Sequence, residues 1–147
     1  MPIIYKQFIP KDVDKYFTSY GKTIDSLVPV WEQTPAILKA SLEKISEQWT
    51  IVHIAVDEEL DEIVWTASCL VECKLHRWWC KAGHIEDVAT RAWRWGKWIW
   101  SNLIKKCVSS AKDAWCYKII LQCTDDLAPY YERFWFEVKG VDMKMYL

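Results

Sequence analysis

Trp93-Arg94-Trp95-Gly96-Lys97-Trp98-Ile99-Trp100 is the segment in which a predicted strand leads through a tight turn into a predicted helix. A turn of this kind can hold a phosphate with its backbone amides, and it favours glycine because a side chain would keep the phosphate away. Here the turn carries indoles. The whole chain has 11 Trp and 4 Gly among 147 residues, whereas glycine usually makes up about 7% of a protein. The segment therefore predicts an anion site in which large residues stand where small ones are expected.

Outward from this turn, the sequence predicts alternating strands and helices. Strands are expected over residues 3–9, 49–56, 63–75, 83–90 and 117–123, and a last strand or strand pair is expected over residues 136–147. Helices are expected over residues 13–20 with Gly21 ending the helix, from Pro35 with Thr34 as the N-cap, over 97–112, and from a cap at Asp125 or Asp126 to residue 133. The acidic residues 57–62 fit a hairpin turn. The run 117–123 is almost wholly apolar, which is typical of a central strand buried on both faces.

This order of elements predicts one α/β or α+β domain over residues 1–147, in which a mixed sheet has helices on both faces. The formal net charge of −1 offers no basic excess for binding nucleic acid. No apolar run approaches the roughly 20 residues that span a bilayer. The amino terminus lacks the pattern of a signal peptide, so a cytoplasmic location is expected.

The chain has six cysteines, at positions 69, 73, 80, 107, 116 and 123. They form no Cys-x-x-Cys motif, and no histidine stands at a zinc-like spacing from a cysteine pair. Buried or scattered free thiols are therefore expected, and no metal site is predicted.

Three clusters of side chains could carry chemistry. The first is Gly83-His84-Ile85-Glu86-Asp87-Val88, at the end of a predicted strand. Its two carboxylates could bind an amine or hold a base near it, or they could form a solvated strand end, and the residues alone leave both interpretations open. His84 by itself is more typical of a hydrogen-bonded structural histidine.

The second cluster is the turn, where Arg94 and Lys97 place positive charge at the N-terminus of a helix, as a phosphate requires. Because the tryptophans would crowd a pyrophosphate, the residues alone favour a structural aromatic cluster. The third cluster is Pro129-Tyr130-Tyr131-Glu132-Arg133-Phe134-Trp135-Phe136. A tyrosine there could act as an acid through its hydroxyl, although aromatics at helical spacing more often belong to a core.

Together these clusters resemble the GNAT acetyltransferases, and within them the branch that acetylates glucosamine 6-phosphate. Residues 83–88 look like the fourth strand of the family, and residues 116–121 look like its fifth. Residues 130–136 resemble its Phe-Tyr-Glu-Lys-x-Gly-Phe segment, and Val141-Asp142-Met143 resembles its final strand. The similarity runs from about residue 51 to residue 147, and more weakly through residues 27–35. The motifs are modest one by one and specific together.

The resemblance implies a single GNAT-fold domain with a mixed, mostly antiparallel, twisted sheet that splays between its fourth and fifth strands. The pantetheine arm of acetyl-CoA would lie in the splay, against the backbone of Val88, Ala89 and Thr90. The pyrophosphate would lie at the helix N-terminus, on the following residues: Arg94, Trp95, Gly96, Lys97, Trp98, Ile99, Trp100 and Ser101. No metal is implied.

The resemblance also implies direct attack by a neutral amine on the thioester, without a covalent enzyme intermediate. Glu86 and Asp87 would orient the amine, an amide near Val88 would stabilise the oxyanion, and Tyr131 would protonate the departing thiolate.

For the sugar phosphate, the resemblance implies Lys74 and Arg77, in the loop after the third strand. Gln122 stands in place of an acidic residue of the fifth strand and is a further candidate to bind the substrate. The family is dimeric, with the site near the subunit interface, so a homodimer is implied as well.

The chain departs from the family at the cofactor turn. The motif Arg/Gln-x-x-Gly-x-Gly/Ala falls on residues 95–100, where only Gly96 stays small and Arg94 lies one position early. Leu127 replaces an asparagine that is usual before the final helix. Eight tryptophans fall where the resemblance places glycine: Trp31, Trp65, Trp78, Trp79, Trp98, Trp100, Trp115 and Trp135.

One hypothesis explains these positions together: UGA codons that the source translates as glycine have been translated as tryptophan. The resulting chain should then be strained wherever a former glycine had a positive φ. Under the rival hypothesis the tryptophans are genuine, and the chain is a GNAT-like binding or scaffolding domain whose cofactor groove is filled. A third interpretation is a tryptophan-rich surface that stacks on sugars or bases.

Overall fold

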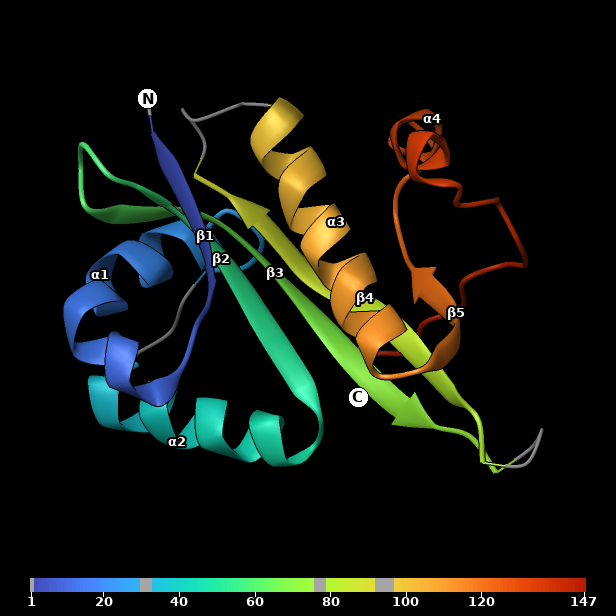
Figure 1. Ribbon diagram of the computed structural model, residues 1–147, viewed down its shortest axis with the longest axis horizontal. Helices are drawn as coiled ribbons and strands as arrows, with labels where there is room; N and C mark the ends of the chain where they lie inside the picture. Colours follow the sequence, from blue (N-terminus) through green and yellow to red (C-terminus); the bar gives the residue numbers. More distant parts are fainter. Residues whose placement is uncertain (1, 30–32, 76–78, 92–96) are drawn as a thin grey trace.

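The computed structural model describes residues 2–29, 33–75, 79–91 and 97–147 (Figure 1). Its elements, in chain order, are β1 (Ile3–Gln7), η1 (Pro10–Asp12), α1 (Val13–Ile24), α2 (Pro35–Glu47), β2 (Thr50–Asp57), β3 (Glu62–Cys73), β4 (Lys81–Thr90), α3 (Lys97–Asp113), β5 (Cys116–Leu121), α4 (Ala128–Tyr131) and η2 (Glu132–Phe134). The strands form one sheet in the order β1-β2-β3-β4-β5. Neighbouring strands are antiparallel except for β4 and β5, which are parallel. The prediction of a mixed, mostly antiparallel sheet is confirmed.

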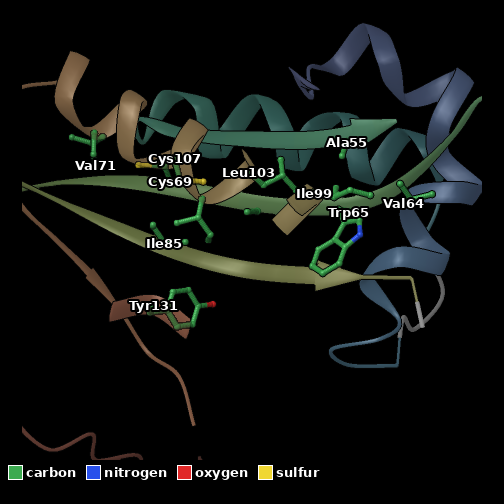
Figure 2. Close-up of a cluster of buried hydrophobic side chains, with 13 residues drawn as sticks. Ala55, Val64, Trp65, Cys69, Val71, Ile85, Ile99, Leu103, Cys107 and Tyr131 are labelled. Atoms are coloured by element: carbon green, nitrogen blue, oxygen red, sulfur yellow. The ribbon is translucent and has the colours of Figure 1, made fainter. Parts of the chain in front are cut away.

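Helices cover both faces of this sheet, so the core has two parts. Under α1 and α2 lies a cluster of Phe8, Val13, Tyr16, Leu38, Leu42, Val52, Ile54, Val56 and Ile63. Under α3, on the opposite face, lies a second cluster that includes Ala55, Val64, Trp65, Cys69, Val71, Ile85, Ile99, Leu103, Cys107 and Tyr131 (Figure 2). The strands contribute side chains to both clusters because successive side chains point to opposite faces of the sheet. None of the described helices is long and apolar enough to cross a bilayer.

The two N-terminal helices begin as their sequences predict, but α1 is longer than expected. Thr34 caps α2 by accepting a hydrogen bond from the Ile37 amide at 3.2 Å, and Pro35 takes the first helical position. The prediction that Gly21 ends α1 is wrong, because the helix continues to Ile24. The buried Thr23 hydroxyl donates to the Ile63 carbonyl at 2.9 Å and fixes this last turn against β3.

The sheet opens between β4 and β5. Their described pairing ends where Ile85 faces Leu121, whereas β4 continues to Thr90. Along its other edge, β4 carries a bulge: Ser68 of β3 faces Glu86 and Thr66 faces Ala89, so β4 contains one extra residue. The expected splay is therefore present, and the bulge lies at the point where it begins.

Three expectations for the C-terminal part of the chain are wrong. β5 is partly exposed at the edge of the sheet instead of buried at its centre, because no described segment pairs with its outer side. Residues 136–147 form no strand, since a strand needs a hydrogen-bonded neighbour. The last helix is only α4 followed by the 3-10 turn η2, and its N-cap is Leu127, which makes no side-chain capping bond; neither Asp125 nor Asp126 caps it.

Candidate active site

The bulge of β4 presents two carboxylates, Glu86 and Asp87, to solvent. Asp87 has a φ of +50°, a left-handed conformation that aspartate tolerates better than most residues. Ser68 of β3 supports the bulge, since its hydroxyl lies 3.1 Å from the Glu86 carbonyl and 3.2 Å from Asp87 Oδ2. The left-handed residue interrupts the alternation of the strand, so two consecutive residues are exposed together.

The three residues after the bulge lead back into the sheet. Val88 is half-buried against the α3-side cluster, Ala89 is buried opposite Thr66, and the Thr90 hydroxyl donates to the Arg91 carbonyl at 3.3 Å. Beyond Ile85 the described chain offers this part of β4 no partner on the β5 side. The backbone expected to hold pantetheine thus lies along the open part of the sheet.

Tyr131 lies at the edge of the same opening. It is a buried member of the cluster that contains Ile85, and Val88 and Leu121 pack against that cluster. Figure 2 shows its hydroxyl directed toward the end of the sheet where Trp65 lies. Burial raises the pKa of the Tyr131 hydroxyl to about 12, and the nearby Cys123 contributes to the rise. The phenol therefore keeps its proton at neutral pH and can donate it.

An aromatic stack fills the space between the first turn of α3 and α4. The Trp100 ring lies 4.2 Å from the Tyr130 ring in a stacked arrangement, 5.6 Å from the Tyr131 ring edge-on, and 5.8 Å from the Trp65 ring. Its indole N–H is buried without a hydrogen-bond partner among the described residues. It lies close enough to the Tyr131 hydroxyl to moderate the rise of the tyrosine pKa, without forming a hydrogen bond of good geometry.

The rest of the expected cofactor turn is only partly described. Ile99 is fully buried and anchors α3, Trp98 is half-exposed, and Ser101 Oγ lies 3.0 Å from the Tyr130 hydroxyl. Arg94, Trp95 and Gly96 lie outside the described residues, as does the side chain of Lys97.

Lys74, the described one of the two candidates for the sugar phosphate, does not join the carboxylates within one subunit. Lys74 follows β3 at the opposite end of the β3–β4 pair, where its amide donates to the Cys80 carbonyl. Glu86 is six residue steps along the extended chain from Cys80, roughly 20 Å. The Lys74 ammonium pairs with Glu72 at 2.5 Å, and His84 Nε2 lies 2.7 Å from the same carboxylate oxygen. Arg77 lies outside the described residues.

Gln122, in contrast, is placed at the opening. It directly follows Leu121, which faces Ile85, and so continues the register toward Glu86. Its side-chain amide donates to Asp142 Oδ1 at 2.7 Å, which ties the C-terminal segment to the end of β5.

Sequence analysis missed two residues of this site, Ser68 and Tyr20. Tyr130 was visible within the third cluster, where it was not separated from its neighbour Tyr131. Tyr20 of α1 lies close to Asp87; burial first, and then that carboxylate, raise the pKa of the Tyr20 hydroxyl to about 12. Nothing in the sequence brings residues 20 and 87 together. Among the described residues, no three His, Cys, Asp or Glu side chains gather as metal ligands would.

Known proteins share both the sequence and the fold. Glucosamine 6-phosphate N-acetyltransferase 1 of Dictyostelium discoideum is 33% identical over 144 residues, which cover 95% of this chain and 90% of that protein. A probable glucosamine 6-phosphate N-acetyltransferase 2 of Oryza sativa subsp. japonica is 38% identical over 98 residues, which cover 65% of this chain and 59% of the rice protein.

The crystal structure of glucosamine-6-phosphate N-acetyltransferase from Arabidopsis thaliana superimposes with a TM-score of 0.91 at 24% identity, over 99% of each chain. No protein-family model matches the sequence. The match to the Dictyostelium protein spans nearly the whole of both chains, and the Arabidopsis structure shares the fold. The chain therefore belongs to the glucosamine 6-phosphate N-acetyltransferase family.

Proposed function

We propose that the chain transfers the acetyl group of acetyl-CoA to the amine of glucosamine 6-phosphate. The observation that carries the proposal is the pair of exposed carboxylates, Glu86 and Asp87, on a bulge where the sheet opens beside the cluster that holds Tyr131. The names of the related proteins support glucosamine 6-phosphate as the acceptor.

The residues at the opening can serve the amine and the leaving group separately. Glu86 and Asp87 would hold the amine and pass its proton to solvent. The bulge amide near Val88 is the candidate donor to the negative charge that develops on the acyl oxygen. Tyr131, still protonated because its pKa is about 12, would donate to the sulfur that leaves. Acetyl-CoA, when bound, supplies the activated acetyl group as a thioester.

These residues fit the reacting end of acetyl-CoA, whereas the described start of α3 does not fit the pyrophosphate end. The Trp100 indole is stacked between Tyr130 and Trp65, and Trp98 stands in the same turn. We therefore assign no step to the residues of this turn. The stack also favours a second candidate function, a GNAT-like binding domain that does not transfer acetyl groups.

A direct assay separates the two candidates. Thiol released from acetyl-CoA would be followed with glucosamine 6-phosphate, and with glucosamine as the control that lacks the phosphate. Both the chain with tryptophan and a variant with Trp65, Trp98 and Trp100 changed to glycine would be measured. Acetylation of glucosamine 6-phosphate by the variant supports the proposal, whereas a folded variant that binds acetyl-CoA and acetylates neither sugar rejects it. Tight binding of acetyl-CoA to the tryptophan chain would reject the filled groove.

We further propose that the working form is a homodimer in the cytoplasm. No described segment pairs with the outer edge of β5, and apolar residues of the C-terminal segment are exposed; both observations support a second copy as the neighbour. In such a dimer, Lys74 and Arg77 of one subunit could serve the phosphate at the site of the other. The buried Cys69 and Cys107 thiols, whose pKa values burial raises, suit a reducing compartment.

A further inference from the structure

Four tryptophans have the backbone conformation of glycine. Seven of the eleven tryptophans lie within the described residues, and four of those have a left-handed backbone, with φ of 59° at Trp49, 65° at Trp79, 61° at Trp115 and 66° at Trp135. In this region the Cβ atom of an L-residue crowds its own backbone, and the conflict is worst for bulky residues. The other non-glycine residues with positive φ in the described chain are both aspartates, Asp61 and Asp87, which tolerate it. At these four positions, a tryptophan side chain strains the backbone, whereas glycine would not.

Three of the four close a helix. Trp49 directly follows the C-cap of α2 and donates its amide to the Ser46 carbonyl at 3.0 Å. Trp115 does the same after α3, with the Lys112 carbonyl at 2.9 Å, and Trp135 after η2, with the Glu132 carbonyl at 3.0 Å. A left-handed residue that ends a helix in this way is usually glycine. The backbone bonds need only the main chain of these residues.

The indole side chains bury little surface that could offset this strain. Trp79, Trp115 and Trp135 expose 76%, 87% and 94% of their surface. Trp49 exposes about half, and its ring lies 4.5 Å from the Lys81 ammonium. Because Trp79, Trp115 and Trp135 are mostly exposed, little packing offsets the strain of their backbone, and the fold does not need tryptophan at these three positions.

We propose that Trp49, Trp79, Trp115 and Trp135 are glycine in the functional protein, because the gene specifies them with UGA codons that the source translates as glycine. UGA differs by one nucleotide from the glycine codon GGA and by one from the tryptophan codon UGG. An exchange at every such codon explains the excess of tryptophan and the scarcity of glycine together.

One consequence rests on the proposed function. If Trp65 and Trp100 have UGA codons as well, glycine at both positions removes two rings of the stack beside Tyr131. The space between the first turn of α3 and α4 would then open toward the cofactor. The codon assignment at the four strained positions stands without this step, so failure of acetyl transfer leaves it intact.

A rival explanation is that the exposed indoles bind sugars. Trp49 and Lys81 do line a shallow hollow of about 300 Å³. This explanation gives no reason for a left-handed backbone at each position, and it predicts that the indoles are present in the native protein.

The primary test is the native polypeptide. Peptide mass spectrometry of the protein from its source, together with the genomic codons, identifies the residues at positions 49, 79, 115 and 135. Glycine in the peptides with UGA in the gene is the expected result. Tryptophan in the peptides, or UGG codons, overturns the proposal.

A second test uses recombinant protein. Trp115→Gly and Trp135→Gly should each raise Tm by roughly 4 °C relative to Trp115→Ala and Trp135→Ala, since only glycine relieves a positive φ. Trp98 lies in the first turn of α3 and provides the matched control, because in a helix Trp98→Gly should melt below Trp98→Ala. Glycine variants at 115 and 135 that are no more stable than the alanine variants would contradict the proposal. If none of these variants folds, the codons and the peptide masses still decide.

Discussion

Tyr131 combines burial, a retained proton and a place in the cluster beside the opening of the sheet. The Tyr131 ring contacts Phe136 and Trp100, and it keeps the contact with Phe136 in the variant in which Trp65, Trp98 and Trp100 are glycine. In that variant, Tyr131→Phe removes the proton donor and leaves the ring packed. We expect kcat to fall by about 10²-fold while the Kd of acetyl-CoA changes by less than about 2-fold. Steady-state assay and calorimetric titration measure the two quantities.

Tyr130→Phe is the matched control for this prediction. It removes a neighbouring hydroxyl that lies 3.0 Å from Ser101 Oγ, and it should leave kcat within about 3-fold of the parent. Equal losses in the two variants would mean that the tyrosines support the cluster and that neither serves the leaving group.

The buried side chain of His53 should make the stability of the protein depend on pH. Its side chain is buried between β2 and α3, where Nε2 lies 2.8 Å from Ser110 Oγ. Burial, with a smaller contribution from Lys106, lowers the His53 pKa from 6.5 to about 4. Between these two values the unfolded chain binds a proton that the folded chain does not, so stability is complete above pH 6.5 and declines as pH falls toward 4. The decline should reach about 3 kcal/mol.

Urea unfolding at several pH values measures this decline, and His53→Gln isolates it from the titration of carboxylates. The variant keeps a polar partner for Ser110 but cannot titrate, so its stability should change less between pH 7 and pH 4.5. If the free energy of unfolding changed equally with pH in the parent and the variant, His53 would bind its proton as readily in the folded protein as in the unfolded chain.

At the scale of single elements, two glycines offer opposite tests of the fold. Gly83 of β4 lies under α3, where an added Cβ would meet the Ala111 Cβ at 2.9 Å and Ile119 Cγ1 at 3.6 Å. Gly83→Ala should therefore destabilise the protein by about 1–3 kcal/mol, because helix and strand must move apart. Gly21 lies within α1, and an added Cβ there would meet nothing within 4 Å. Gly21→Ala should stabilise the protein by about 1 kcal/mol through helix propensity.

Chemical unfolding of the Gly83→Ala and Gly21→Ala variants measures both changes in stability. A neutral Gly83→Ala would mean that β4 and α3 pack less closely than described, and a destabilising Gly21→Ala would mean that α1 ends at Gly21, as its sequence alone suggested.

The elements also show how far the sequence determines the site. Glu86 and Asp87 were predicted at the end of a strand, just before the tryptophan-rich turn. The bulge that exposes both could not be predicted, since it depends on how β4 pairs with Ser68 and Thr66 of β3. The approach of Tyr20 to Asp87 likewise depends on the packing of α1 against the sheet. Local sequence patterns predict which element a residue belongs to, whereas the pairing of distant segments determines which residues surround it.

The same limit applies to the molecule as a whole. The apolar run of β5 suggested a central strand, and the alternation after residue 136 suggested a last strand, but both need a neighbour that the described chain does not supply. Val141, Met143, Met145 and Leu147 alternate with polar or amphipathic residues and expose between 81% and 111% of their surface. Such a row of apolar side chains on an unpaired segment is typical of a surface covered by another chain.

If a second copy covers this row, charge placed on it should separate the subunits. The double variant Val141→Lys, Met143→Lys puts two ammonium groups on the apolar side of the segment, where pairing would have to bury them. Light scattering after size exclusion should give the mass of a dimer for the parent and that of a monomer for the variant. Lys144→Gln changes a polar residue of the same segment, which pairs with Asp142, and should leave the dimer intact. A monomeric parent would reject the homodimer. A dimeric double variant would place the interface elsewhere, and the apolar C-terminal segment would then lack the occupant proposed for it.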